Sequence, residues 1–261
     1  MQGSCMSVRA GKIQLVMGAV LLACSHAPPG SATENSVTTT NFVVTYQTIA
    51  REQAEKFAAE AEKDYAAVTS YLGRRYSRPI RVYISDNYAF PRYRKEVGKI
   101  FIPTDRFPLA QSVVSKAQRR GTGLLISITP IIAPSANTRW GDFLETGLRT
   151  HIQEKFGRKE EQPFPTMGRD LHEETAQLVS DYGKFIPLAN AEEARTWRTR
   201  PTRTRRLAYL EAGSFVRYLI EQQGLEKFLQ WYDGGRFEDV YTRPLSAIEQ
   251  EWQRYVESLG R

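Results

Sequence analysis

Cysteine is nearly absent from this chain. Of its 261 residues only Cys5 and Cys24 are cysteines, and both precede the part of the sequence with globular patterning. A disulfide therefore cannot cross-link the folded domain, and a cysteine cluster cannot bind a metal ion within it. The hydrophobic and charged fractions are ordinary, so length and composition predict one compact domain with a full-sized core.

The apolar run near the start of the chain is too short to span a membrane comfortably. Ile13–Ala23 is uncharged and follows the basic residues Arg9 and Lys12, an order typical of an export signal, here residues 1–23. The stretch Leu21-Leu-Ala-Cys24 resembles a bacterial lipobox, which implies that Cys24 is lipidated and becomes the new N-terminus. An ordinary signal peptide cleaved nearby, or an unprocessed apolar segment, are the alternatives.

The lipobox resemblance implies an exported protein that is lipid-anchored to the bacterial cell envelope. Ser25, directly after the cysteine, is compatible with sorting to the outer membrane, where the protein would face the periplasm. Residues 24–40 are rich in Ser, Thr, Pro and Ala, a composition typical of a flexible tether. His26 belongs to this tether and has no expected role.

Basic residues outnumber acidic ones, and the excess lies in one segment. Removing Arg9 and Lys12 from the net charge of +7 leaves +5, and Glu193–Arg206 matches that excess. We expect this loop to bind anionic envelope surfaces rather than nucleic acid, because an exported protein meets headgroups and glycans first. Alternatively, it is a solvated loop with some arginines paired to acids elsewhere. Its arginines are Arg195, Arg198, Arg200, Arg203, Arg205 and Arg206.

The patterning of the remaining chain predicts an α+β fold. Short β-rich runs at 42–46, 79–85 and 99–103 surround a helix over 48–72 and are followed by a helix over 109–120. Helices dominate the rest, over 140–156, 170–182, 208–223 and the C-terminal end. We therefore expect a domain over 41–261, with a small sheet lobe and its packed helix (about 41–120) and a mostly helical lobe (about 121–261).

The stretch 121–156 is the part around which the chain is organised. Its apolar run, Leu124–Ala133, contains Pro130, which lacks a backbone donor and costs about 3 kcal/mol in a helix interior. We expect this helix either to end near Ile128 or to kink. The next helix opens with Trp140-Gly-Asp-Phe-Leu-Glu145-Thr-Gly-Leu.

That order, together with residues 170–188 and 208–256, resembles the peptidase MA-like (gluzincin) zinc metallopeptidases. The resemblance implies a thermolysin-like fold in which an apolar helix carries HExxH and a second helix supplies a Glu as third zinc ligand. Here Ile126, Ser127 and Pro130 stand at the positions of the two histidines and the general base. The HExxH motif is therefore degenerate.

Two further residues fall on the family's functional positions. Glu145 matches the third zinc ligand, and Tyr209 matches a tyrosine that donates a hydrogen bond to the oxyanion. Glu145 is alternatively a polar residue on a solvated helix, and Tyr209 is equally explained as core packing with a polar handle.

The two histidines of the globular part do not restore the motif. His151 lies six residues after Glu145 and does not share its helix face, so we expect a surface or hydrogen-bonded residue. His172-Glu173-Glu174 begins like HExxH, but Ala176 stands where the second histidine is needed. We expect His172 and its acidic neighbours to be structural.

The sequence thus predicts an exported, membrane-anchored pseudo-metallopeptidase with no zinc, whose cleft binds a peptide or a protein partner. One alternative is an active zinc metallopeptidase with non-standard ligands. A hydrolase using Ser127 lacks any recognisable nucleophile setting. The other alternative is an envelope protein that binds anionic surfaces through the arginine loop.

Overall fold

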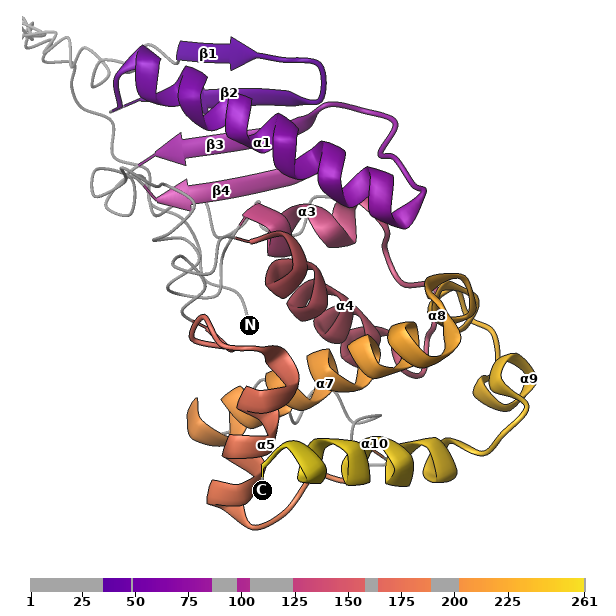
Figure 1. Ribbon diagram of the computed structural model, residues 1–261. Coiled ribbons are helices and arrows are strands. Elements are labelled where there is room, and N and C mark those ends of the chain that lie inside the picture. Colours follow the sequence, from indigo (N-terminus) through magenta and orange to yellow (C-terminus); the bar gives the residue numbers. More distant parts are fainter. Residues whose placement is uncertain are drawn as a thin grey trace, which may run out of the picture. The chain divides into compact units, whose positions relative to one another are not determined.

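The computed structural model describes residues 35–47, 49–85, 98–103, 124–157, 164–188 and 202–260 (Figure 1). The predicted signal segment, Cys24 and the predicted helix over 109–120 lie outside these residues. In the part that is described, no helix is both long and apolar enough to cross a membrane.

The N-terminal elements form a four-stranded sheet in the order β1-β2-β3-β4. Strand β2 (Phe42–Tyr46) pairs in parallel with β3 (Ile80–Ser85), and β3 pairs in parallel with β4 (Lys99–Pro103). Alternate side chains of β2 and β3 are buried, as expected for strands with one face on a core. These three predicted strands are confirmed.

Strand β1 (Asn35–Thr38) lies within the stretch predicted to be a tether. It runs antiparallel to β2, with Val37 opposite Val44. The prediction of a tether over 24–40 is therefore wrong for its last residues, because backbone pairing with β2 orders a short segment that composition alone marks as flexible.

Helix α1 (Arg51–Leu72) connects β2 to β3, packs on β1 and β2, and ends at Gly73 in the left-handed conformation. Glu62 ties it to the β1–β2 turn: its carboxylate accepts hydrogen bonds from the Thr39 hydroxyl (2.6 Å) and from the backbone (2.7 Å) and side-chain (2.6 Å) nitrogens of Asn41. Burial alone would raise the pKa of Glu62, but these hydrogen bonds outweigh it and lower the pKa.

Helix α3 (Leu124–Ile132) runs through Pro130 instead of ending near Ile128. The proline removes one backbone donor, at about 3 kcal/mol. Beyond it the helix buries Ile131 and Ile132, each of which contributes about 1.5–3 kcal/mol. That gain offsets the cost, and the predicted end at Ile128 is wrong.

The remaining chain is helical. Helix α4 (Gly141–Phe156) packs most extensively on α7 (Thr202–Gln223), and α5 (Leu171–Tyr182) packs on α7 and on α10 (Leu245–Leu259). The short helices α8 (Leu225–Tyr232) and α9 (Phe237–Tyr241) lie between α7 and α10 in the chain. A small sheet with a packed helix and a larger set of helices agrees with the predicted α+β class.

Glycines allow α4 and α7 to approach closely. A Cβ at Gly147 would lie 2.4 Å from a methyl carbon of Val216 and 2.5 Å from the Ala212 carbonyl oxygen. A Cβ at Gly213 would lie 2.5 Å from the Thr150 methyl carbon. Both glycines belong to stretches on which the family resemblance rests, and the structure gives them a packing role.

A long-range hydrogen bond connects α10 to the segment after α5. The N-cap of α10 is Pro244, without a side-chain cap. The Glu249 carboxylate accepts the backbone N–H of Leu188 at 2.8 Å.

Candidate functional site

The three positions that the resemblance assigns to a degenerate motif lie on one face of α3. Ile126, Ser127 and Pro130 are partly exposed, whereas the other six residues of the helix are buried. Pro130 lies four residues after Ile126 and three after Ser127, and these spacings place all three side chains on the same side of a helix. We call this surface the α3 face. It is the face on which a ligand set of the HExxH type would have to lie.

Glu145 is held by an ion pair within α4. Its carboxylate lies 3.1 Å from the Arg149 guanidinium, one turn further on, and its side chain is 22% exposed. Its helix, α4, packs on α3. The charge of Glu145, after burial, raises the pKa of Tyr232, whose hydroxyl donates to the Ala133 carbonyl at 2.7 Å.

Tyr209 is placed elsewhere. It lies on α7, and its ring packs edge-on against Phe164 with 5.5 Å between centroids. Glu145 and Tyr209 share no partner among the described residues. The structure therefore places Glu145 on a helix that packs on α3, and the contact that it gives Tyr209 is ring packing.

The α3 face does not fit the zinc ion that the resemblance implies. Zinc in proteins is bound by imidazole nitrogen, thiolate or carboxylate, and Ile126, Ser127 and Pro130 offer none of these groups. Glu145, the remaining carboxylate, is already paired with Arg149. Over the described ranges, no three His, Cys, Asp or Glu side chains are grouped so that they could hold a metal ion.

His151 is buried rather than on the surface. It is 4% exposed, and its Nε2 atom lies 2.8 Å from the Tyr71 hydroxyl of α1. Its Nδ1 atom is buried without a hydrogen-bond partner in the described part of the chain. Burial, followed by the charge of Lys155, lowers the pKa of His151 to about 3. The ring is therefore neutral at physiological pH.

His172 belongs to a chain of hydrogen bonds that runs from the core to the surface. Its Nδ1 atom lies 2.8 Å from the Ser214 hydroxyl and its Nε2 atom 3.4 Å from the Glu221 carboxylate. The Trp252 indole donates to the Ser214 oxygen at 2.9 Å. Because an indole N–H can only donate, the Ser214 oxygen accepts from Trp252 and its O–H can donate to His172 Nδ1. The imidazole hydrogen then lies on Nε2 and can be donated to Glu221.

Ser214, His172 and Glu221 are arranged like a Ser-His-Glu catalytic triad but cannot act as one. Ser214 is fully buried inside helix α7, and its oxygen is occupied by the Trp252 indole. A catalytic serine has to be accessible to a carbonyl carbon and to lie beside an oxyanion hole. The chain of hydrogen bonds therefore fixes helix packing.

Arg217 connects this hydrogen-bond network, through Glu221, to acidic residues of α4 and of the N-terminal end of α5. Its guanidinium lies 2.7 Å from Asp170, 2.7 Å from Glu221 and 3.3 Å from Glu154. Burial raises the pKa of Glu154. Burial alone would also raise the pKa of Asp170. The hydrogen bonds that its carboxylate accepts from Arg217 and from the backbone N–H groups of α5 outweigh burial and lower this pKa. One cation thus contacts three carboxylates, which come from α4, from α7 and from the N-cap of α5.

Sequence reasoning missed Arg217 altogether. The only local signal is the Arg217–Glu221 spacing of four residues on one helix, which is common on helix surfaces. For His172 the expected structural role agrees with its contacts. Asp170 is the N-cap of α5, where its side chain accepts hydrogen bonds from the backbone of His172 and Glu173.

The predicted arginine loop is only partly described. Arg195, Arg198 and Arg200 lie outside the described residues, and Arg203 lies in α7 without a described side chain. Arg205 and Arg206 belong to the first turns of α7, so the prediction of a loop is wrong there. The Arg206 guanidinium pairs with the buried Glu174 and donates to the Pro165 carbonyl at 2.9 Å.

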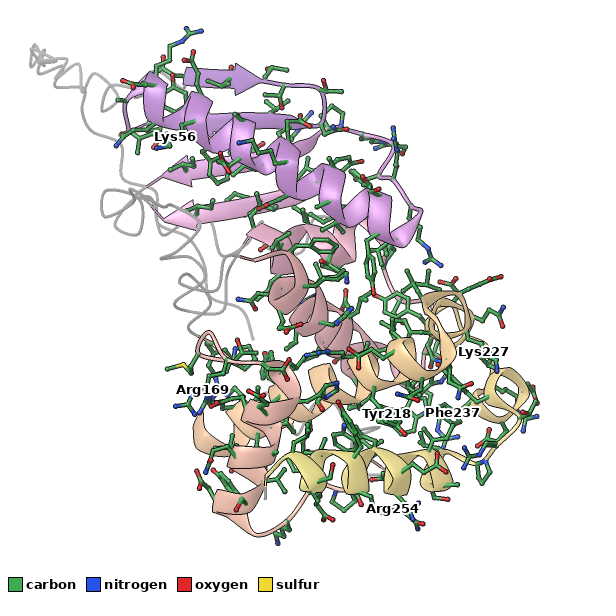
Figure 2. All side chains as sticks on the ribbon, viewed as in Figure 1. Lys56, Arg169, Tyr218, Lys227, Phe237 and Arg254 are labelled. Atoms are coloured by element: carbon green, nitrogen blue, oxygen red, sulfur yellow. The ribbon has the colours of Figure 1, made fainter. Side chains whose placement is uncertain are left out.

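Glu174 also forms an ion pair with Arg169, whose guanidinium lies 3.1 Å from the carboxylate. The Arg169 side chain is 66% exposed and extends outward from the turn before α5 (Figure 2). The buried carboxylate of Glu174 needs a compensating positive charge. Because Arg206 supplies that charge, it is not available to an external anion.

Comparison with protein-family models, with curated proteins and with solved structures finds no match for this chain.

Proposed function

We propose that this protein is a non-catalytic, peptidase-like binding protein of the cell envelope, which uses the surface around the α3 face to bind a peptide or a protein partner. One observation carries the proposal. The only partly exposed side of an otherwise buried apolar helix presents Ile126, Ser127 and Pro130, where the family resemblance places a catalytic motif.

The chemistry of the α3 face supports binding rather than catalysis. An isoleucine and a proline offer apolar surface, and a serine offers one donor and acceptor, which together suit contacts with an extended peptide. Hydrolysis would need an activated water and a general base. None of the three side chains supplies either, and Glu145 is neutralised by Arg149.

Export and anchoring through Cys24 belong to the same proposal and rest on the sequence alone. The alternative of a zinc enzyme with other ligands is less well supported, because His151 and His172 are both buried and each is held by a neighbour. Anionic-surface binding through the arginine loop is weakened by the Arg206–Glu174 pair.

Fluorescein-labelled unfolded casein peptides test the proposal. We expect the wild-type protein to bind them without cleaving them, and Ile126→Glu to weaken binding about tenfold or more, because it places a charge on an apolar contact surface. Ser36→Glu, on the exposed strand β1, is the control for added charge. Chelator-sensitive cleavage, or equal binding by wild type and Ile126→Glu, would contradict the proposal.

A further inference from the structure

Three exposed arginines lie where α1 leads into β3 (Figure 1). Arg75 and Arg78 belong to the connecting segment, and Arg81 belongs to β3 itself. We call these three residues the basic stretch. In the part of the chain that the structure describes, no carboxylate pairs with any of them. Arginines elsewhere on the surface do have acidic partners: Arg51 pairs with Glu55, Arg236 with Asp239 and Arg243 with Glu251.

The segment that carries the basic stretch is held in place by its neighbours. The Tyr65 hydroxyl of α1 donates to the Tyr76 carbonyl at 3.2 Å and accepts the Tyr76 backbone N–H at 3.1 Å. Arg74 donates from both guanidinium nitrogens to the Asp233 carboxylate at the end of α8, one of them at 2.8 Å. Ordered backbone therefore presents the cations, and little further ordering is needed on binding.

Arg81 points away from the core. Its neighbours in β3, Ile80 and Val82, are fully buried together with residues of α1. Because successive side chains of a strand point to opposite faces of the sheet, Arg81 lies on the other face. The Gly98 carbonyl accepts the backbone N–H of Arg81 at 2.8 Å, which fixes its position at the start of the strand.

Two acids contact neighbours of the basic stretch, but both are engaged elsewhere. Asp233 is paired with Arg74. The Glu62 carboxylate accepts hydrogen bonds from Thr39 and Asn41, and the Asn41 carbonyl accepts the backbone N–H of Ile80 at 2.8 Å. Neither acid forms an ion pair with the basic stretch, so its guanidinium groups are available to an external anion.

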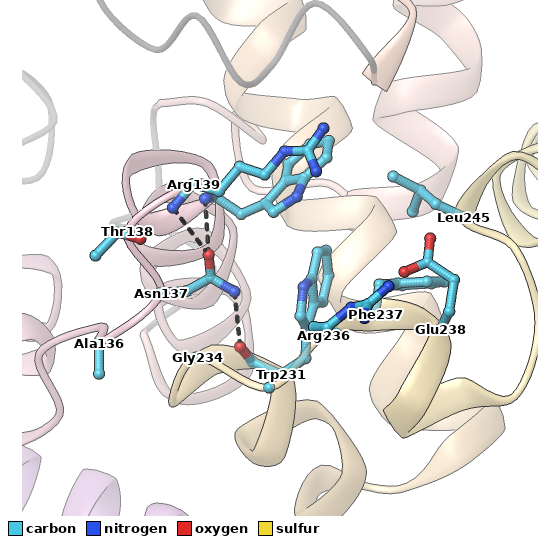
Figure 3. A pocket seen from close by; sticks show the side chains of 12 residues that line it. Ala136, Asn137, Thr138, Arg139, Trp231, Gly234, Arg236, Phe237, Glu238 and Leu245 are labelled. Atoms are coloured by element: carbon cyan, nitrogen blue, oxygen red, sulfur yellow. Dashed lines mark hydrogen bonds between the residues drawn. The ribbon is translucent and has the colours of Figure 1, made fainter.

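The surroundings of the basic stretch favour a flat anionic surface over an enclosed ligand. The cavity in Figure 3 is lined by residues 136–140, Trp231, residues 234–238 and Leu245, and the basic stretch is not part of it. The nearby rings are packed: a Cβ at Gly98 would lie 2.6 Å from the Tyr76 hydroxyl, and Tyr83 stacks on Phe101 with 5.0 Å between centroids. Single-stranded nucleic acid is bound through free rings on which its bases stack, whereas exposed guanidinium groups match phosphate.

From these observations we infer that the basic stretch is a docking surface for a membrane that contains anionic phospholipid. It is distinct from the arginine loop expected from the sequence, where Arg206 is paired inside the protein. The inference goes beyond the proposed peptide binding at the α3 face and does not require it. Beside the anchor proposed at Cys24, this contact determines which side of the domain meets the bilayer.

Vesicle sedimentation tests the inference on the full chain, with Cys24→Ala so that no lipid anchor contributes. The probes are vesicles of phosphatidylcholine alone and of phosphatidylcholine with phosphatidylglycerol in equal parts. An arginine close to an anionic surface contributes about fivefold to the partition coefficient, so three predict about a hundredfold preference for the mixed vesicles. The preference should fall as salt is added.

Two triple variants locate the effect. Arg75→Gln, Arg78→Gln and Arg81→Gln together should lose most of the preference, and thermal melts should match wild type because the three side chains are exposed. Arg51→Gln, Arg236→Gln and Arg243→Gln together remove the same charge from paired positions. This control should keep the preference within about fivefold of wild type, since distant charges are screened.

Equal partition of the wild-type protein onto both kinds of vesicle would overturn the inference. So would equal losses in the two triple variants, or no loss in the first. Heparin serves as a soluble polyanion: binding of heparin through the same arginines, without a preference for the mixed vesicles, would replace a membrane by an anionic polymer as the partner. Peptide binding at the α3 face has its own variant, Ile126→Glu, so the two proposals can fail separately.

Discussion

The carboxylate of Glu145 lies 3.1 Å from the guanidinium of Arg149, one turn further along α4. This ion pair engages Glu145, the one acidic residue that the family resemblance assigns to the site as a zinc ligand. A carboxylate with an arginine partner on its own helix has its charge already balanced. It stabilises α4 by a modest amount, as partly exposed pairs at this spacing do, about 0.3–0.5 kcal/mol.

Acid should destabilise the fold through His151. Its folded pKa, about 3, lies below its unfolded value of about 6.5, so between these values the unfolded chain binds a proton that the native protein does not. The free energy of unfolding should therefore fall as the pH drops through this window, by about 1.4 kcal/mol per pH unit for this group.

Urea titrations at about pH 7.5 and about pH 5 would measure this loss, expected to be about 2 kcal/mol from His151. His172, whose pKa burial also lowers, adds to it in the same direction. In His151→Gln the loss should be smaller. An unchanged pH dependence in that variant would show that His151 is not the group responsible.

Gly147→Ala should destabilise the contact between α4 and α7. The added methyl group would lie 2.4 Å from a Val216 carbon and 2.5 Å from a backbone oxygen, so one helix must shift, at about 1–3 kcal/mol. Gly141→Ala, on the same helix, meets nothing closer than 3.9 Å and should be neutral or slightly stabilising. Thermal melts of the two variants compare them directly; equal melting temperatures would argue against close packing at Gly147.

Arg217→Met should destabilise the protein by about 1–3 kcal/mol, because it leaves the partly buried carboxylates of Glu154 and Asp170 without their cation. Partial exposure of the acids keeps the loss below that of a fully buried pair. Arg243→Met removes an arginine from the exposed pair with Glu251 and should leave stability unchanged. Chemical unfolding of both variants would check this, and similar losses would refute a special role for Arg217.

Pro130→Ala should stabilise the protein by about 1–2 kcal/mol. It restores a backbone donor inside α3, worth up to about 3 kcal/mol, but also gives the unfolded chain more freedom, which offsets about 1 kcal/mol. The helix already runs to Ile132, so the new residue fits the existing backbone. A loss of stability on denaturant unfolding would indicate that the proline is required locally.

The sequence predicted the parts of the fold that depend on local pattern. The alternation in Phe42–Tyr46 and the apolar stripe of Arg51–Leu72 depend on period and burial, and both elements form where expected. Strand β1 was missed because its four residues gain order only by pairing with β2. Of the two outcomes predicted for α3, an end near Ile128 or a kink, the first is wrong because the burial of Ile131 and Ile132 outweighs a local rule about proline.

The candidate site was predictable only where it depended on helix periodicity. Spacing alone places Ile126, Ser127 and Pro130 on one face, and the structure leaves that face partly exposed. No local pattern could show that Arg217 contacts carboxylates of α4 and of the N-cap of α5, or that His172 contacts Ser214, because these contacts span tens of residues. Long-range polar contacts depend on tertiary packing.

The zinc content of a restored-motif variant tests the central claim most directly. Ile126→His, Ser127→Glu and Pro130→His together would place two imidazoles and a general base on the α3 face, with Glu145 as the third ligand. After exposure to zinc and removal of the excess, mass spectrometry should find about one zinc per chain in the triple variant, much less when Glu145→Ala is added, and none in wild type. Stoichiometric zinc in wild type, or a folded triple variant that binds none, would contradict the account.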